Sequence, residues 1–454
     1  MFMTANRAPT LLTPALCGAY FLVLLDVTVV NVALPRIALD LTADSAALAW
    51  IVDAYALPLA SLLLVSGAIG DHVGHRRVVL AGIVCFWGAS AACACAPTVA
   101  WLIAPRAVQG IGAALMLPGT LALLVGTIRD ERARNRLVGT WAAVGGAALP
   151  AGPLIGGLLV EAAGWRSVFW LSVPLIAAAI IPVLRLPREP HASGSARIDR
   201  AGAVALTVCL VAFVAAIIET PGSIVAGGVL AGVAICSVIA CVRIERHAPQ
   251  PLLRVPPSGR GMLALAALVA GLMNLCALGV LFVLTRVFQD VHLLGPLGAG
   301  LLTLPAMLPL PLLARPSAAL ASRIGVWWTC AIGAALAAGL AFVAATSADV
   351  TDGLGPLVVA LALWCTGLGV LTPAVVAAAL RAAPEVPGLA SGVSNTARQT
   401  GGALGVALFS AVAGGVDDPG FAMRCAYLLA GAACVFVVSA GLCAFAARSR
   451  GRQG

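Results

Sequence analysis

The sequence predicts an all-α integral membrane protein, and three observations support this fold class. The chain of 454 residues is 61% hydrophobic and only 10% charged, and its mean hydropathy is +1.05. Soluble domains carry about 25% charged residues, so a water-soluble protein is excluded. The apolar residues form long segments that can cross the hydrocarbon core as helices. The basic residues between these segments fall mostly on one side of the membrane, as expected of an oriented protein.

Fourteen segments are long and apolar enough to be transmembrane helices, because a helix needs about 20 residues to cross the bilayer. We expect them near residues 11–33, 46–68, 78–96, 99–125, 137–160, 167–184, 201–219, 223–242, 262–285, 297–314, 325–346, 355–379, 396–415 and 425–446. The first is too long for a signal peptide and no small-residue cleavage pattern follows it, so we expect it to be retained. The expected location is the cell membrane, in a bacterium the inner membrane.

The arginines indicate how these helices are oriented. The chain contains 27 basic residues, all of them arginine, and most of them fall in connections on one side of the membrane. Arg398, at the edge of the segment 396–415, is counted with these connections. The exceptions are Arg106 within a segment and Arg36, Arg166, Arg286 and Arg424 on the other side. The positive-inside rule then places both termini in the cytoplasm. This asymmetry accounts for the net charge of +9. A nucleic-acid partner is not indicated, since no basic groove with interleaved aromatic residues is present.

Two connectors rich in arginine and proline, residues 185–200 and 243–260, divide the chain. They enclose only two predicted helices. We therefore expect an N-terminal six-helix bundle over 1–186, a linker with two inserted helices over 187–260, and a C-terminal six-helix bundle with a cytoplasmic tail over 261–454. Transporters often consist of two related halves. A short resemblance between the loops at 67–77 and 318–326, which occupy corresponding positions, weakly supports such a repeat.

Three ionisable residues lie inside predicted helices of the first half. Arg106 is the one charged residue between Arg77 and Arg129, Asp26 lies in the first helix, and Asp53 lies near the start of the second. A charge within the membrane costs about 3 kcal/mol or more, so such residues usually face a partner or a water-filled cavity. All three are expected at similar depth, which predicts one polar cavity. A carboxylate there can bind and release a proton. The alternative is a fixed ion pair that ties helices together, and Asp53 has the further alternative of reaching the membrane interface.

Two other stretches have unusual patterns. The predicted fifth helix is rich in residues that let helices approach closely or bend, namely Gly139, Gly152, Pro153, Gly156 and Gly157. Ordinary packing of small residues is the alternative for any single glycine. The loop after the second helix combines turn glycines with an acid and a basic pair, namely Gly67, Asp71, Gly74, Arg76 and Arg77. We interpret it as a latch in which Asp71 contacts a neighbouring helix.

These stretches resemble the motifs of the major facilitator superfamily, in particular its fourteen-span drug:proton antiporter branch. The resemblance is carried by Asp26 to Pro35 in the first helix, by Leu102, Arg106, Gln109, Gly110 and Gly112 in the fourth, and by the glycines and Pro153 of the fifth, with Ala148 where a further glycine is usual. It also includes residues 391–402 and covers essentially the whole chain. The loop departs from the family pattern at His72 and His75, where basic residues are usual.

The resemblance implies a two-bundle fold whose central cavity opens alternately to each side, and proton-coupled efflux of drugs, antibiotics or similar amphipathic molecules. Asp26 or Asp53 would carry the proton, Arg106 would tune its affinity, and Gln109 and Asn31 would belong to the same coupling site. The expected partners are a small-molecule substrate, protons and the lipid bilayer, and the expected working unit is a monomer.

Other functions remain as alternatives. Within transport, the alternative is a dedicated exporter of one endogenous metabolite, because few aromatic residues occur in the predicted helices and promiscuous binding by stacking is not obvious. A membrane sensor would need a soluble output domain, and no connector exceeds about twenty residues. An intramembrane enzyme would need a nucleophile and base or a metal cluster. The thirteen cysteines form no C-x-x-C pattern and suit helix packing. No cofactor, metal or enzymatic activity is therefore expected.

Overall fold

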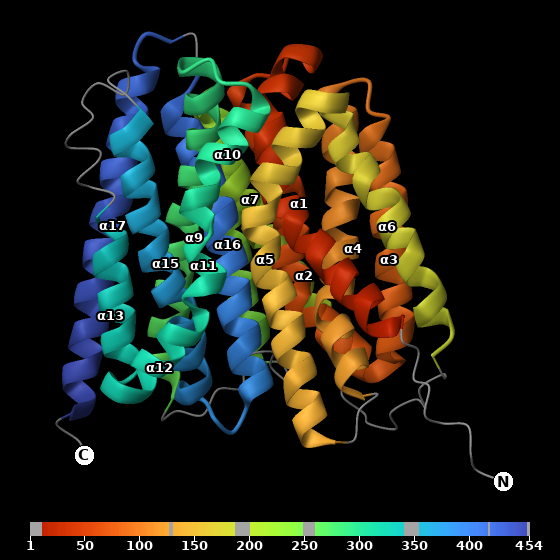
Figure 1. Ribbon diagram of the computed structural model, residues 1–454, viewed down its shortest axis with the longest axis vertical. Coiled ribbons are helices and arrows are strands. Elements are labelled where there is room, and N and C mark those ends of the chain that lie inside the picture. Colours follow the sequence, from red (N-terminus) through yellow and green to blue (C-terminus); the bar gives the residue numbers. More distant parts are fainter. Residues whose placement is uncertain are drawn as a thin grey trace.

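The structure is a computed structural model that describes residues 11–126, 130–186, 200–247, 259–339, 354–415 and 418–451. Within these ranges the regular structure is helical (Figure 1). The first six helices are α1 (Leu12–Leu41), α2 (Ser45–Val73), α3 (His75–Ala94), α4 (Val99–Gly126), α5 (Glu131–Ala163) and α6 (Arg166–Leu184). A pair follows, α7 (Arg200–Glu219) and α8 (Ile224–His247).

The remaining helices form the second half of the chain. They are α9 (Arg260–Arg286), the π-helical turn η1 (Val287–Val291), α10 (Pro296–Met307), α11 (Pro309–Leu312), α12 (Ala314–Ile324), α13 (Val326–Ala337), α15 (Leu354–Ala382), α16 (Pro387–Ala413) and α17 (Phe421–Gly451). Several helices are longer than their predicted segments. The first, for example, continues to Leu41 instead of ending at 33, because hydropathy marks only the part of a helix that lies in hydrocarbon.

The chain is a multi-pass membrane protein. Ten of the described helices are long and apolar enough to cross a membrane, and the bent segment from Pro296 to Ile324 adds an eleventh if it counts as one span. Helices α7, α13 and α16 coincide with predicted segments but are not among these. The apolar stretches of α7 and α13, Val204–Glu219 and Val326–Ala337, are short, and α16 has a polar first half.

The predicted segment 297–314 is not one straight helix. It is divided into α10, α11 and the beginning of α12, and the two arms, Pro296–Leu312 and Ala314–Ile324, are bent by more than 40°. Pro309 and Pro311 lie just before the bend. Proline lacks an amide hydrogen and its ring clashes with the preceding turn, which explains why the helix breaks here.

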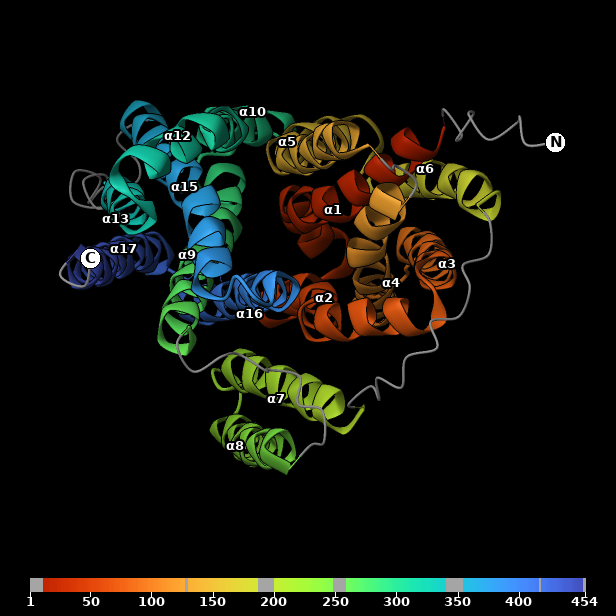
Figure 2. The ribbon, with the colours of Figure 1, turned by 90° about the horizontal axis from the view of Figure 1, so that it is seen from below.

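Two bundles lie side by side, and the α7–α8 pair lies outside both (Figure 2). Helices α1 to α6 form one bundle and α9 to α17 form the other. The bundles meet where α2 packs against α16 and where α5 packs against α10. The pair contacts both bundles, because α7 packs against α2 and α16. The indole Nε1 of Trp50 in α2 donates a hydrogen bond of 2.9 Å to Glu219 at the end of α7.

Glycines allow the closest helix contacts in the first bundle. A Cβ atom on Gly110 of α4 would lie 3.0 Å from the carbonyl carbon of Tyr55 in α2 and closer still to its oxygen. The backbone atoms of Tyr55 cannot move aside to make room for a Cβ atom, whereas the end of a flexible side chain could. Helices α2 and α4 therefore approach this closely because Gly110 has no side chain.

We expect Gly110→Ala to lower the free energy of unfolding by about 1–3 kcal/mol, because the added methyl group forces the two backbones apart. Thermal unfolding of the purified protein in detergent measures this change. Gly88→Ala on α3 is the matched control, since a Cβ atom there meets nothing within 4 Å and alanine favours a helix. Equal stability of the two variants would contradict the tight contact.

Candidate functional site

Asp26 of α1 and Arg106 of α4 form a buried ion pair inside the first bundle. Arg106 Nη1 donates to Asp26 Oδ2, and the two side chains are only 1% and 3% exposed. Both residues lie well inside apolar helices that qualify as membrane spans. The pairing explains how the two charges are tolerated, because each compensates the other where no bulk water reaches them.

Gln109 completes a closed ring of hydrogen bonds with this pair. Its Oε1 accepts a bond of 2.7 Å from Arg106 Nη1, and its Nε2 donates one of 3.1 Å to Asp26 Oδ1. Nε2 also lies 3.0 Å from the hydroxyl oxygen of Ser90 in α3, which in turn donates to the carbonyl of Phe86. Each oxygen of the Asp26 carboxylate thus accepts one hydrogen bond from this ring, and a proton that binds there weakens the attraction of the carboxyl group for both donors.

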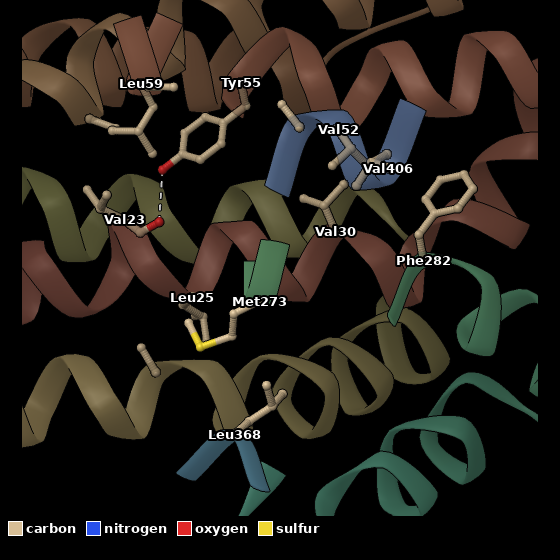
Figure 3. Close-up of a cluster of buried hydrophobic side chains, with 14 of the residues drawn as sticks. Val23, Leu25, Val30, Val52, Tyr55, Leu59, Met273, Phe282, Leu368 and Val406 are labelled. Atoms are coloured by element: carbon tan, nitrogen blue, oxygen red, sulfur yellow. Dashed lines mark hydrogen bonds between the residues drawn. The ribbon is translucent and has the colours of Figure 1, made fainter. Parts of the chain in front are cut away.

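The guanidinium of Arg106 is held from several sides. Its Nε donates a bond of 3.0 Å to the carbonyl of Ile51 in α2. Its Cζ lies 4.4 Å from the ring centre of Tyr55 and 5.9 Å from that of Phe169 in α6, distances at which aromatic faces stabilise a cation. The Tyr55 hydroxyl donates to the carbonyl of Val23 at 2.8 Å (Figure 3). Nothing in the sequence singles out Ser90, Tyr55 or Phe169 for this role, since all are ordinary helix residues.

Asp53 and Asn31 are buried but do not join this ring. Asp53 is 0% exposed, and neither carboxylate oxygen has a hydrogen-bond partner. Asn31 is 1% exposed, and its Nδ2 donates to the carbonyl of Val27 at 2.9 Å while its Oδ1 has no partner. The structure thus brings Asp26, Arg106 and Gln109 together and leaves Asp53 and Asn31 as separate buried polar groups.

The residues expected in a loop after the second helix lie mostly in helices. Gly67 and Asp71 belong to the end of α2, and Arg76 and Arg77 belong to the first turn of α3, so the connection is reduced to Gly74. Gly74 ends α2 and begins α3 with φ at 100°, a backbone conformation that favours glycine. Arg76 donates from Nε and Nη2 to the carbonyls of Val183 and Leu184, at 3.1 and 2.7 Å, at the end of α6. A Cβ atom on Gly67 would lie 4.0 Å from Pro118 of α4. Arg77 has an interaction partner, and the side chain of Asp71 lies outside the described part of the structure.

Small residues of α5 bring this helix against both bundles. Cβ atoms on Gly152 and Gly156 would collide with Thr28 and Val29 of α1, and one on Gly157 would lie 2.6 Å from the carbonyl oxygen of Pro296 in α10. A Cβ atom on Gly300 of α10 would lie closer still to the carbonyl oxygen of Pro153. Gly139 lies nearer the start of α5, away from these contacts.

Several hydrogen bonds join the two bundles, and they lie at the end of the molecule opposite both termini (Figure 1). Ser45 Oγ donates to the carbonyl of Gly414 at 2.7 Å, and Ser410 Oγ donates to the carbonyl of Ser45 at 2.8 Å. The carboxylate of Glu161 in α5 accepts from the amide of Leu297 in α10 at 3.1 Å. At mid-height, apolar side chains of both bundles pack together (Figure 3). Gln289 Nε2 of η1 also donates to the carbonyl of Val32 in α1 at 2.9 Å.

Within the described ranges, no three histidine, cysteine or acidic side chains are grouped so that they could hold a metal ion. All thirteen cysteines are free thiols.

Two helical bundles of this kind, with a buried charge network in one of them, define a membrane transporter architecture. The chain belongs to the Major Facilitator Superfamily, which it matches over residues 16–406. It is 35% identical over 415 residues to the methylenomycin A resistance protein of Streptomyces coelicolor, covering 89% of this chain and 86% of the relative. It is 33% identical over 411 residues to the tetracenomycin C resistance and export protein of Streptomyces glaucescens, covering 88% and 74%.

A solved structure has the same fold. The crystal structure of a peptide transporter, POT, in complex with sulfate superimposes with a TM-score of 0.74 and covers 98% of this chain and 95% of that one. The sequence identity is 15%, so the likeness extends to the fold alone.

Proposed function

We propose that the protein is a proton-coupled antiporter that exports antibiotics, drugs or similar amphipathic small molecules by alternating access. The observation that carries this proposal is the closed ring of Asp26, Arg106 and Gln109. The Asp26 carboxyl group in this ring can bind a proton, lies within apolar helices, and can form or break its hydrogen bonds to the other two residues. The names of the relatives support the cargo class, since each confers resistance to an antibiotic and one is also an exporter.

In this mechanism Asp26 alternates between two states. Ionised, it pairs with Arg106 and accepts from Gln109. Protonated, it releases Arg106, which then relies on the carbonyl of Ile51 and the ring of Tyr55. Because Arg106 contacts α2 and α6 as well as α1, a change in its partner changes how these helices pack. The inward movement of each proton supplies about 2.3 kcal/mol per 100 mV of membrane potential, in addition to the pH gradient.

We further propose that α7, α13 and α16 also cross the membrane, which completes fourteen spans with both termini in the cytoplasm of a bacterium, at its inner membrane. The functional units are then residues 1–186, 187–260 and 261–454, in one monomer. In this orientation the hydrogen bonds between Ser45, Ser410 and Gly414 close the external end. Asp53 is a second candidate proton carrier. The segment from Gly67 to Arg77, at the junction of α2 and α3, and the glycines of α5 support the movement of the bundles.

The test begins with a drug-sensitive host that expresses the chain and is challenged with cationic, neutral and anionic toxins. A toxin to which it confers resistance is then supplied to everted membrane vesicles. Accumulation should require a proton gradient and collapse when a protonophore is added. Accumulation that is indifferent to the protonophore would overturn proton coupling, and the absence of any resistance or accumulation would overturn the export function.

A narrower function, export of one dedicated metabolite, is favoured by the scarcity of aromatic contacts. Among the described residues, Tyr20 and Trp141 form the one stacked ring pair, while Trp165 and Phe169 meet edge to face. A promiscuous site that binds by stacking would need more aromatic surface. Competition for transport among unrelated compounds discriminates between the two functions, since a dedicated exporter should be inhibited by close analogues only.

A further inference from the structure

The guanidinium of Arg398 has no acidic partner among the described residues of the second bundle. It lies about three turns into α16, within the helix and not in the connection where the charge pattern of the sequence places it. Its Nε is buried without a hydrogen-bond partner. The described acids of this bundle are Asp290, Glu385 and Asp418, and they lie at helix ends or in loops. Arginine inside a membrane protein usually faces a partner or a cavity.

The group that Arg398 does face belongs to the other bundle. Its guanidinium interacts electrostatically with the phenol of Tyr20 in α1. Tyr20 lies about two turns from the start of α1 and Arg398 about three turns from the start of α16, and both helices start at the end of the molecule that carries the termini (Figure 1). The two residues thus lie at similar depth, in the half of the molecule away from the hydrogen bonds of Ser45 and Glu161.

Tyr20 is part of a fixed aromatic surface. Its ring stacks on that of Trp141 in α5, with centroids 3.8 Å apart and planes within 10°. Gly145, one turn along α5, leaves room for the ring, because a Cβ atom there would collide with it. The indole of Trp141 is oriented by a hydrogen bond of 3.4 Å to the hydroxyl of Thr120. Flat aromatic groups held in this way can bind another flat group with little loss of side-chain freedom.

We propose that Arg398, Tyr20 and Trp141 form a binding site for an organic anion, a carboxylate attached to a flat unsaturated group, and that such molecules are the preferred cargo. This proposal rests on the export function proposed above and specifies its substrate class. A guanidinium forms two parallel hydrogen bonds with a carboxylate. Ser394, one turn before Arg398 on the same helix face, has a buried hydroxyl with no partner and offers a further donor.

Anionic cargo also fits the charges around the site. In the first bundle, Asp26 and Arg106 neutralise each other, so this ion pair has no net charge to attract a carboxylate. Arg398 supplies that charge in the second bundle. A cationic cargo would be repelled by the unpaired Arg398 guanidinium. The property to test is therefore whether the protein binds an anionic ligand more tightly than neutral or cationic ligands of the same shape.

Isothermal titration of the purified full-length protein, in detergent free of phospholipid, measures this preference directly. The probes are 2-naphthoate, the neutral 2-naphthamide and 2-naphthylmethylammonium, which share one ring system and differ in charge. We expect naphthoate to bind most tightly. Arg398→Gln should weaken naphthoate about tenfold to a hundredfold, the loss expected for a hydrogen bond to a charged group, and should leave naphthamide unchanged. Arg398→Lys should recover part of the loss.

The matched control is Arg381→Gln, which removes an exposed arginine from the last turn of α15 and should not alter binding. Size-exclusion chromatography checks the folding of each variant, and the ranking of the three probes on the unaltered protein does not depend on any variant. Absence of naphthoate binding, equal or tighter binding of the ammonium, or naphthoate binding that Arg398→Gln does not weaken would each overturn the proposal.

A second arm adds phosphatidylglycerol to the detergent. If this lipid binds in an Arg398-dependent manner and excludes naphthoate, the anion is a lipid headgroup and the cargo proposal is wrong. Because binding is measured without a gradient, a failure here leaves proton-driven export intact. Conversely, transport that ignores a protonophore refutes the coupling without affecting the anion preference.

Discussion

Asp26→Asn is expected to abolish gradient-driven accumulation in everted vesicles, leaving only the level seen with a protonophore. The amide has the size of the carboxyl group. Its oxygen can accept the bond from Arg106, whereas its NH2 group is a donor and can bond to Gln109 only after the Gln109 amide turns over, because Gln109 donates to Asp26 in the present ring. The introduced amide cannot bind or release a proton in the functional pH range. Binding of the exported toxin, measured without a gradient, should remain within a few-fold of the original, because the change removes coupling and not the cargo site.

Glu385→Gln is the matched control for this variant, since Glu385 is an exposed carboxylate in the connection between α15 and α16, and its neutralisation should not affect transport. Asp53→Asn tests the second buried carboxylate, which has no hydrogen-bond partner. Undiminished pH-driven transport by Asp26→Asn would exclude Asp26 as the proton carrier. If Asp53→Asn alone abolished it, the carrier would be Asp53.

The first bundle's ionisable residues could be predicted from the sequence because a charge within an apolar segment stands out in one dimension. Asp26 and Arg106 were identifiable in this way, and Gln109 through the resemblance of the fourth helix to the family motif. The structure brings the three side chains into one hydrogen-bonded ring. Their other partners were not identifiable. Ile51 contributes a backbone carbonyl and Ser90 a hydroxyl common in helices, and neither group has a sequence signature.

The sequence predicted that the segments are helices and where they lie along the chain, but it did not predict the residues at which they begin and end. Arg398 shows the consequence. The polar residues of its segment make the apolar stretch begin near 396, whereas α16 begins at Pro387. In the sequence, Arg398 therefore resembles a loop residue although it lies in the third turn of α16. It was counted among the arginines that orient the protein in the membrane, and not among potential cargo contacts. The break between α10 and α12 had its cause in the sequence, in Pro309 and Pro311, but hydropathy does not register backbone breaks.

Arg106→Gln is expected to lower the free energy of unfolding by about 3–5 kcal/mol, the cost typical of removing one partner from a buried ion pair. Asp26 would then be left as a buried carboxylate, 2% exposed, with Gln109 as its remaining donor. Thermal unfolding in detergent measures the loss. Transport should be lost as well, so the single variant does not separate a structural role of the pair from a role in coupling.

The double variant Asp26→Asn with Arg106→Gln makes that separation. Replacing both partners removes the uncompensated charge, so we expect most of the stability to return, as is common when a buried pair is neutralised as a whole. The two residues are in contact, and their effects on stability should therefore be strongly non-additive. Gradient-driven export should nevertheless stay absent, because no proton-binding group remains at the ring. A stable double variant that still exported its cargo with the proton gradient would show that the pair only ties α1 to α4, and that the coupling lies elsewhere in the molecule.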